Sequence, residues 1–400
     1  MKILLLNHNV KGIGTYIRCL HFAKNLVHFG HSVTILTSAP QFIFIPYREI
    51  ADGVEIICMP DIAGRRFRNG GLGPIDTLMR CLYLPGKQFD IVENFDHRPA
   101  VLYPALFGKY ILGIPLVSEW TDLHGTGGSL NNRPPLTRCL IRPYEDLSER
   151  MSKKIAERLI VISHGLRDMA LRLGIPKKKI IWIPGGADIE NIKPQPKKDA
   201  RQRLQLPIDK KLILYSAGTH YDIELLLSTI NKIQSARPDA VLVTTGAMLE
   251  ERHKRLLFDP ARLIEFGFLP YKAYTELLPC ADLFIFPFSN RTLNVGRWPN
   301  KIGDYMAAGR PIVSNKTGDI VEVFKEHDIG LLAADDPEEF AQNALNILAN
   351  DEIAFKLGIN ARKAAEQFFD WRILTKRLED CFFEVTGRKG KRDLYEEVVH

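Results

Sequence analysis

The chain has 400 residues, of which 46% are hydrophobic and 25% charged, and its formal net charge at pH 7 is +7. This composition excludes a disordered or fibrous protein, and the length favours two domains that each bury their own core. No uninterrupted apolar run approaches the roughly 18 residues that a membrane-spanning helix requires, so we expect a soluble protein.

The cysteine pattern indicates a reducing compartment. Six cysteines are scattered along the chain, at positions 19, 58, 81, 139, 280 and 381. They form no C-x-x-C pair and no spacing typical of zinc ligands, so we expect neither a disulfide framework nor a metal site. Residues 1–6 are too short for the apolar core of a signal peptide, and the polar Asn7 follows at once. We therefore expect a cytoplasmic protein.

Positive charge is concentrated in the first half of the chain. Residues 1–192 contain 24 Lys and Arg against 17 Asp and Glu, whereas residues 193–400 contain 30 of each kind. Basic runs lie at residues 65–68, 133–142 and 177–179. Such a half favours an anionic partner, namely a membrane surface, a phospholipid or a sugar phosphate. The alternative is a solvated surface that keeps the protein soluble. Nucleic acid is disfavoured because no reader motif accompanies the charge.

In the first half, apolar segments alternate with amphipathic helical segments, which is typical of a parallel sheet with crossover helices. Predicted strands lie at residues 2–6, 32–37, 53–59, 91–93, 115–119, 159–163 and 179–183. Predicted helices lie at residues 15–29, 99–112, 135–156 and 165–173.

The second half repeats this alternation after a Pro- and Lys-rich linker at residues 194–198. Predicted strands lie at residues 211–216, 240–245, 263–266, 283–287 and 311–314, and predicted helices at residues 222–235, 250–258, 273–278, 302–308, 337–350, 351–368 and 369–384. We therefore predict an α/β protein with domains at residues 1–192 and 193–368, a terminal helix at residues 369–386 and a frayed tail at residues 387–400.

Two glycines follow the first predicted strand. Gly12 and Gly14 permit the backbone to approach a ligand closely. The spacing is not a dinucleotide-binding fingerprint, because the third glycine and the acidic residue about 20 positions later are missing. A simple tight turn explains these glycines equally well.

Polar residues follow the strand predicted at residues 115–119. Residues 119–129 read EWTDLHGTGGS and combine two acids, a histidine and three glycines. At the end of a parallel strand, such residues form the polar floor of a ligand site. His124 is the leading candidate for a catalytic residue and Asp122 is the competing one. A histidine with only a structural hydrogen-bonding role is the alternative.

The most informative stretch is residues 297–313, RWPNKIGDYMAAGRPIV. Pro299 suits the start of a helix, and Gly309 suits the residue just after its end. The helix N-terminus attracts phosphate, and Arg297 and Lys301 add cations beside it. Asp304 lies on the same face as Lys301 and can accept two sugar hydroxyls. These groups suit a nucleotide-sugar site, whereas the alternative is a helix packed on a sheet with both cations merely solvated.

This stretch resembles the donor-binding signature P-x-K-x-x-E-Y-M-A-x-G-x-P-V-V of family 4 glycosyltransferases with the B-type fold. The matching residues are Pro299, Lys301, Tyr305, Met306, Ala307, Gly309, Pro311 and Val313. The resemblance places Asp304 where the family has the glutamate that binds the donor ribose, and it includes Asn300 in the donor site. The family's second glutamate, eight residues earlier, corresponds to Gly296, so the grip on the donor sugar differs.

Three further segments, at residues 9–16, 29–34 and 161–188, match the family in the same order. The resemblance implies that Gly12 and Gly14 lie over the donor diphosphate and that His124 lies near the transferred sugar.

Two segments of the second half bear on the donor. In the family, an Arg and a Lys that bind the diphosphate follow the loop at Gly218. Here Thr219, His220 and Tyr221 follow, so Arg297, Lys301 and Arg291 would supply the charge. Phe268 lies in a segment, residues 265–269, that resembles the one whose backbone reads the nucleotide base. A plain strand-turn explains that segment nearly as well.

The resemblance implies two facing Rossmann-like domains with a cleft between them, the acceptor on the first and the nucleotide sugar on the second. It implies a hexosyltransferase-type enzyme that retains anomeric configuration and acts on a glycan or lipid-linked acceptor in cell-surface polysaccharide synthesis, in the cytoplasm or at the inner face of the membrane. No cofactor beyond the nucleotide-sugar co-substrate is expected. The lack of Asp-x-Asp argues against the metal-dependent A-type enzymes.

Two rivals stay open. Gly296 and the missing Arg and Lys after Gly218 suit a catalytically silent nucleotide-sugar-binding or scaffolding subunit. The same fold also serves epimerases, which convert a nucleotide sugar with no acceptor.

Overall fold

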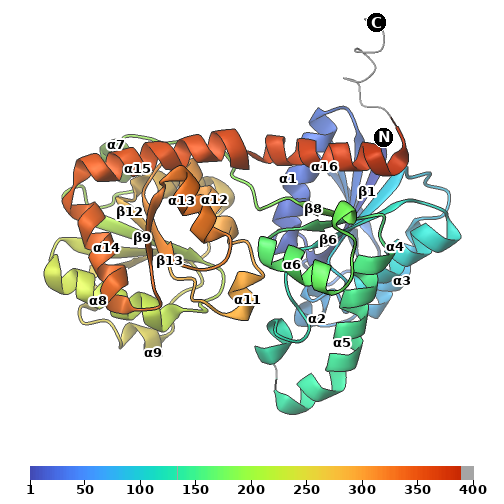
Figure 1. The fold of residues 1–400 in the computed structure, drawn as a ribbon, viewed down its shortest axis with the longest axis horizontal. Helices are drawn as coiled ribbons and strands as arrows, with labels where there is room; N and C mark the ends of the chain where they lie inside the picture. Colours follow the sequence, from blue (N-terminus) through green and yellow to red (C-terminus); the bar gives the residue numbers. More distant parts are fainter. Residues whose placement is uncertain (133, 389–400) are drawn as a thin grey trace, which may run out of the picture. The chain divides into compact units, whose positions relative to one another are not determined.

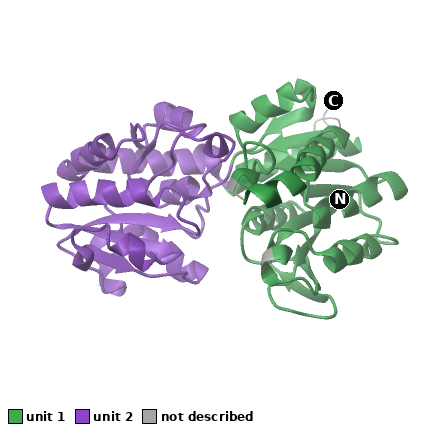
Figure 2. Cartoon of the chain, turned by 90° about the horizontal axis from the view of Figure 1, so that it is seen from below, with its two compact units in different colours: residues 1–184, 371–400 green, residues 185–370 purple. Residues whose placement is uncertain are grey.

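The computed structural model describes residues 1–132 and 134–388. The chain forms two compact units, which Figure 2 distinguishes by colour. The first comprises Met1–Pro184 and the chain from Trp371, and the second comprises Gly185–Asp370. Each unit is an α/β sandwich with its own sheet, which is mostly parallel in the first unit and parallel in the second (Figure 1). The predicted fold class is thereby confirmed.

The first unit has an eight-stranded sheet in the order β3-β4-β2-β1-β5-β6-β7-β8. Only the pair of β3 and β4 is antiparallel among the strand pairs of the described residues. The strands are β1 (Lys2–Val10), β2 (Ser32–Ser38), β3 (Tyr47–Ala51), β4 (Val54–Met59), β5 (Ile91–Phe95), β6 (Leu116–Trp120), β7 (Arg158–Val161) and β8 (Ile180–Trp182). The helices are α1 (Thr15–His28), α2 (Arg65–Asn69), α3 (Pro74–Tyr83), α4 (Pro99–Ile111), α5 (Pro135–Ile155), α6 (His164–Arg172) and α16 (Trp371–Thr386).

Strand β1 shows why the predicted strands are continuous apolar runs in the sequence. Ile3 and Leu5 pack into the core that α1 and α16 cover. Leu4 and Leu6 pack into a separate core on the other face, which α3 and α4 cover. Alternate side chains of a strand point to opposite faces, so a strand covered on both faces must be apolar throughout.

Helix α16 follows the second unit in sequence but packs in the first. The Trp371 ring stacks on His21 at 4.8 Å between centroids and meets Phe22 edge-on at 5.4 Å. Leu374, Leu378 and Phe382 are fully buried in the same core. The apolar stripe of this helix therefore finds its partner in α1.

The second unit has a six-stranded parallel sheet in the order β11-β10-β9-β12-β13-β14. Its strands are β9 (Lys211–Ala217), β10 (Ala240–Gly246), β11 (Leu263–Glu265), β12 (Leu283–Phe286), β13 (Ile312–Asn315) and β14 (Gly330–Ala333). Its helices are α7 (Lys197–Arg203), α8 (Ile223–Ala236), α9 (Glu251–Lys254), α10 (Tyr271–Leu277), α11 (Thr292–Val295), α12 (Asn300–Ala307), α13 (Ile320–His327), α14 (Pro337–Ala349) and α15 (Asp351–Ala364), the last continued by a π-turn at Ala365–Phe369.

The structure places the unit boundaries at residues 184/185 and 370/371, whereas we predicted them at 192/193 and 368/369. Residues 185–192 belong with the second unit because backbone groups tie them to its last helix. The Ala187 N–H donates to the Phe369 carbonyl at 2.6 Å, and the Arg362 guanidinium donates to the carbonyls of Ile189 and Ile192. Of the predicted tail, residues 389–400 lie outside the described part.

Several elements were not predicted. The strand β3 is an edge strand with alternating exposure, and β14 begins with a glycine, so neither has the apolar run of a central strand. The short helices α2 and α11 have too few residues for a periodic pattern. The predicted helix at residues 250–258 is limited to Glu251–Lys254.

Candidate functional site

Helix α12 is built from the stretch with the strongest sequence signal. We predicted Pro299 at the first helical position, but in the structure it is the N-cap and the helix begins one residue later, at Asn300. Gly309 ends it with a φ of +65°, the left-handed conformation predicted there. Gly303 lies against the backbone of Gly186, where a Cβ atom would collide with the carbonyl oxygen. These three residues fix where the polar face of the helix lies.

The polar face of α12 forms a cluster of Lys301, Asp304 and Tyr274 of α10, which we call the donor cluster. The Tyr274 hydroxyl donates to the Asp304 carboxylate at 2.7 Å. The Lys301 ammonium donates to that hydroxyl at 3.0 Å and lies 3.5 Å from the carboxylate. Burial raises the pKa of Asp304, while Lys301 and the hydrogen bond from Tyr274 lower it. The cluster thus holds a carboxylate ready to accept hydroxyl groups.

Tyr274 was missed by sequence reasoning. It lies 30 positions from Asp304 in the chain, and the pattern around it shows only a helix. A second tyrosine of α10, Tyr271, donates in the same way to Asp188. Burial, followed by the neighbouring carboxylates, raises the pKa of both phenols, so they act as neutral donors.

The loop before α12 holds the other predicted cation. The Arg297 guanidinium lies 4.9 Å from the centre of the Tyr221 ring, a cation–π contact that links this loop to the one after β9. Gly296 caps the short helix α11, and Asn300 is exposed at the first position of α12. Tyr221 stands in the loop where the resembled family places cationic residues, and it contacts a cation instead.

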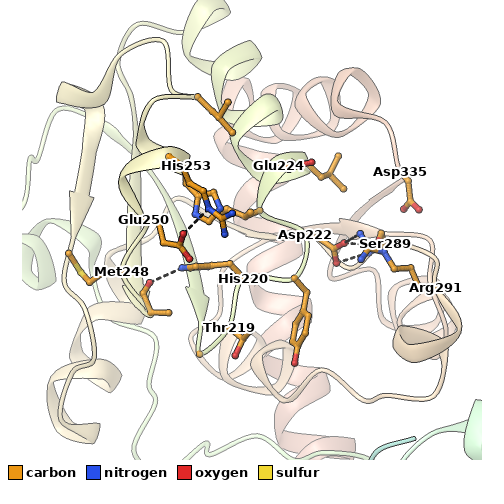
Figure 3. A pocket seen from close by; sticks show the side chains of 17 residues that line it. Thr219, His220, Asp222, Glu224, Met248, Glu250, His253, Ser289, Arg291 and Asp335 are labelled. Carbon is orange, nitrogen blue, oxygen red and sulfur yellow. Dashed lines mark hydrogen bonds and ion pairs between the residues drawn. The ribbon is translucent and has the colours of Figure 1, made fainter. Parts of the chain in front are cut away.

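A pocket of about 830 Å³ opens beside these loops, at the carboxyl ends of β9, β10 and β12 (Figure 3). This is the edge of a parallel sheet where ligands bind in open α/β domains. Its lining includes Gly218 and Thr219, as predicted residues of the donor site, and the first residues of α8. The N-terminus of this 14-residue helix therefore presents its free N–H groups to the pocket.

Arg291 also lines the pocket, but it is held by a carboxylate. Its guanidinium donates to Asp222 at 2.7 Å, and the Ser289 hydroxyl donates to the same oxygen at 2.5 Å. The side chain of Arg291 remains 62% exposed, so its other N–H groups face solvent. On the opposite wall, the Nε2–H of His220 donates to the Ala247 carbonyl at 3.0 Å.

Phe268 is not part of this lining. It lies in the loop after β11 and is 76% exposed. Gly296, Arg297, Asn300, Lys301 and Asp304 also lie outside the lining, and Arg297 contacts the lining residue Tyr221.

In the first unit, the turn after β1 contains the two predicted glycines. Gly12 and Gly14 have φ angles of +93° and +62°, which favour glycine. A Cβ atom on Gly14 would collide with the Asn9 carboxamide, whose oxygen accepts from the Thr15 N–H at 2.7 Å. The space around Gly12 is open, so a ligand can approach its backbone.

His124 belongs to a buried group of polar residues at the ends of β1, β5 and β6. We call His8, Asp96, His97, Arg98 and His124 the histidine cluster. Arg98 donates to Nδ1 of His124 at 2.9 Å, so Nε2 must carry the proton of the neutral ring. That nitrogen lies 3.5 Å from the Asp96 carboxylate. The arrangement sets the tautomer and the orientation of the imidazole.

Asp96 is the anchor of this cluster. It is fully buried with a φ of +66° and accepts from both the N–H and the hydroxyl of Thr121, at 3.0 and 2.5 Å. Burial alone would raise the pKa of Asp96, but the hydrogen bond from His124 and the nearby charge of Lys153 hold it well below its usual range. Burial lowers the pKa of His8 to about 3, so this ring is neutral.

A carboxylate beside His124 thus comes from Asp96. Asp122, our competing candidate for the catalytic residue, stays a prediction. Asp122 lies two residues before His124, and its backbone carbonyl accepts from the Trp120 indole at 3.0 Å. Asp96, His97 and Arg98 were all missed, although a signal was present. The polar run that they form directly follows the strand predicted at residues 91–93.

The described residues, 1–132 and 134–388, contain no group of three or more His, Cys, Asp or Glu that could hold a metal ion. None of their helices is both long and apolar enough to cross a membrane.

Two family descriptions match this chain. Residues 10–191 match Glycosyltransferase Family 4, and residues 210–350 match Glycosyl transferases group 1. The chain belongs to the family 4, group 1 glycosyltransferases. Its two units together have the B-type fold of these enzymes.

Named relatives agree with this assignment. An uncharacterized glycosyltransferase of Methanocaldococcus jannaschii, MJ1607, is 22% identical over 402 residues, which span 94% of this chain and 96% of the relative. The Bacillus subtilis protein YtcC is 26% identical over 198 residues, and that match spans about half of each protein, 46% of this chain and 48% of YtcC.

Solved structures share the fold at low identity. Sucrose-phosphate synthase from Thermosynechococcus elongatus has a TM-score of 0.74 and 16% identity, covering 97% of this glycosyltransferase and 100% of the synthase. Anabaena HepE, solved in complex with UDP-glucose, has a TM-score of 0.66 and 16% identity, covering 96% and 100%.

Proposed function

We propose that this glycosyltransferase moves a hexosyl group from a nucleoside-diphosphate sugar to a glycan or lipid-linked acceptor, with retention of configuration and without a metal ion. The observation that carries the proposal is the donor cluster beside the pocket of the second unit. Asp304 accepts the ribose hydroxyls, while Lys301, Arg297, Arg291 and the N-terminus of α8 meet the diphosphate. The complex of HepE with UDP-glucose supports a donor of this class.

The transfer step needs little covalent chemistry from the protein. The bond between the anomeric carbon and the diphosphate oxygen breaks, and the acceptor oxygen bonds to the same face of that carbon. The acceptor proton passes to the departing diphosphate, so no carboxylate nucleophile is required. Fixed cations and helix N–H groups stabilise the charge that develops on the leaving group, and this is the largest contribution that we assign to the protein.

We assign the acceptor to the first unit, where His124 is the candidate for contact with it. Its Nδ1 contacts Arg98 and its buried Nε2 lies beside Asp96, so both ring nitrogens face protein groups and the orientation of the ring is fixed. In this role His124 shapes the acceptor site by packing, held in place by Arg98 and Asp96.

Calorimetry tests the donor assignment. The purified protein is titrated with nucleoside diphosphates and nucleotide sugars, beginning with UDP-glucose, with and without a chelator. We expect one tight ligand whose binding survives chelation and is lost in Lys301→Ala. Anomeric analysis of the product by NMR then decides between retention and inversion. Binding that needs a divalent ion would overturn the metal-independent part of the proposal.

The rivals give different outcomes in the same assays. An active transferase hydrolyses its donor slowly when acceptor is absent. A silent subunit would bind the donor but would show no hydrolysis. An epimerase would convert the donor sugar with no acceptor present. Neither is favoured by membership of a glycosyltransferase family.

The excess charge of the first half supports a place at the inner face of a membrane in cell-surface polysaccharide synthesis. A peripheral protein there would meet both a lipid-linked acceptor and a cytoplasmic donor, and the basic residues would face anionic headgroups.

A further inference from the structure

Helix α5, which is labelled in Figure 1, has two faces with very different side chains. Its inner face carries the acids Glu145 and Glu149, which the first unit uses. Glu145 bonds to His97 and Arg98, and Glu149 accepts from the N–H groups of His124 and Gly125 at 3.0 and 2.9 Å. The helix is therefore firmly oriented, with its negative charge buried.

The outer face of α5 is an exposed apolar stripe. It consists of Leu136, Leu140, Tyr144, Leu147 and Met151, spaced by three or four residues so that they share one side of the helix. Leu136, Leu140 and Leu147 are 75%, 72% and 62% exposed. Single exposed apolar residues are ordinary, but a continuous row over four turns marks an interaction surface.

The charges beside this stripe are cationic. Lys154 lies on the same side of the helix as the stripe and Arg150 borders it, and both are exposed. Arg138 and Arg142 are also exposed but lie on the opposite side, where Arg142 pairs with Asp146. The one remaining acid of α5, Asp146, accepts from the N–H and the hydroxyl of Thr126, each at 2.8 Å. The surface that α5 offers is thus a leucine row bordered by arginine and lysine, with its acids already bonded.

We propose that the outer face of α5 docks on an anionic lipid bilayer. Leu136, Leu140, Leu147 and Met151 enter the boundary between headgroups and acyl chains, and the flanking cations bind lipid phosphates. Arginine and lysine have long stems that keep their charge at the headgroups while the helix sinks below them. The inference deepens the membrane location suggested under the proposed function and rests on it for the identity of the surface.

A neighbouring helix extends the same surface. Tyr103 of α4 is exposed, and its hydroxyl lies 3.5 Å from that of Tyr144. Tyrosine is the residue type that collects at the level of lipid headgroups. The pair therefore extends the surface of α5 with side chains suited to the headgroup level.

Flotation with vesicles tests the proposal. Full-length protein is mixed with phosphatidylcholine vesicles with or without phosphatidylglycerol, and the double variant Leu136→Gln, Leu140→Gln is run alongside. Glutamine keeps helix propensity close to that of leucine, so α5 should still form. We expect wild type to float with the anionic vesicles and the variant to partition at least tenfold less. Phe355→Gln in α15, a 70% exposed apolar residue of the second unit, should float like wild type.

An environment-sensitive dye on Cys139 locates the contact. Cys139 is exposed next to Leu140, Cys81 is half-buried and the other four cysteines are buried, so a Cys81→Ser background gives one labelled site. A blue shift on adding anionic vesicles is expected. Flotation without a blue shift would overturn the assignment to α5, and no flotation of wild type would overturn docking altogether.

Donor titration separates this inference from the proposed function. The double variant should bind the nucleotide sugar found for wild type with unchanged affinity. If wild type floats but binds no nucleotide sugar, the proposed function fails while the docking surface stands.

Discussion

The donor cluster and the histidine cluster are built in opposite ways. Lys301 and Asp304 lie on one turn of α12, so their proximity follows from local helix geometry. His8, Asp96 and His124 come from the ends of three different strands, β1, β5 and β6. The first kind of site is visible in a short stretch of sequence, whereas the second exists only once the sheet order is known.

The two clusters also differ in what they present to a ligand. The donor cluster has a partly exposed lysine and carboxylate, 35% and 21% exposed at the side chain, which suits direct binding. In the histidine cluster, Asp96 is fully buried and lies beside His124, so it suits a positioning role. Changes at the first should therefore alter donor affinity, and changes at the second should alter the rate of transfer.

The largest effect is expected from Asp96→Asn. The variant removes the charge that orients the Nε2–H of His124, so kcat should fall about a hundredfold, within the range that positioned acid–base groups contribute, while donor Kd stays unchanged. Steady-state kinetics and calorimetry measure the two quantities. Asp122→Asn is the matched control and should keep most activity; if the larger loss occurred there, Asp122 would be the stronger candidate.

The second prediction tests the close packing of α12 against Gly186. In Gly303→Ala the new methyl group meets the Gly186 carbonyl, so we expect unfolding to become easier by about 2 kcal/mol, typical of overpacking. Alanine favours helix over glycine by roughly 1 kcal/mol, which is too little to compensate. Chemical denaturation measures the change. Gly64→Ala, where the added atom meets open space, should be close to neutral, and equal stability of both variants would contradict the close packing.

The phosphate assignment predicts a smaller but specific loss. Lys301→Ala or Arg297→Ala should weaken donor binding at least tenfold, about 1.4 kcal/mol, because each removes a cation near the diphosphate. Calorimetry with the identified donor is the measurement. Lys316→Ala removes an exposed lysine paired with Glu339 and serves as the control. Unchanged donor binding in both Lys301→Ala and Arg297→Ala would contradict the assignment of these cations to the diphosphate.

The smallest effect concerns pH. An ordinary aspartate has a pKa of about 3.9. Burial raises the pKa of Asp304, so its carboxylate becomes protonated at a higher pH than that of an ordinary aspartate. Since the charged form accepts ribose hydroxyls better, donor affinity should fall several-fold as pH decreases through the raised pKa. Asp304→Asn should weaken the donor and abolish this pH dependence, while pyrophosphate binds almost as before. Equal loss of donor and pyrophosphate would speak against a ribose contact.

Much of the fold was predictable because its signals are local. Apolar runs such as Ile3 to Leu6 identified buried strands, and Gly309 marked the end of α12 through its left-handed backbone. The proximity of Lys301 and Asp304 on α12 was predictable for the same reason, since helix periodicity places them together. Edge strands such as Tyr47–Ala51 were missed because half of their side chains are exposed and lack an apolar run.

Other features depend on contacts between distant residues. Asp96 reaches Thr121, which lies 25 positions later, only because β5 and β6 are neighbours in the parallel sheet. Arg291 lies against Asp222 across 69 positions, and Arg297 lies on Tyr221, so these two cations are held by partners that no spacing rule reveals. Helix α16 joins the first unit because its apolar stripe needs the core around Phe22. Local periodicity records which face of an element is buried, but the choice of partner is made by packing, where shape and charge must match across the whole chain.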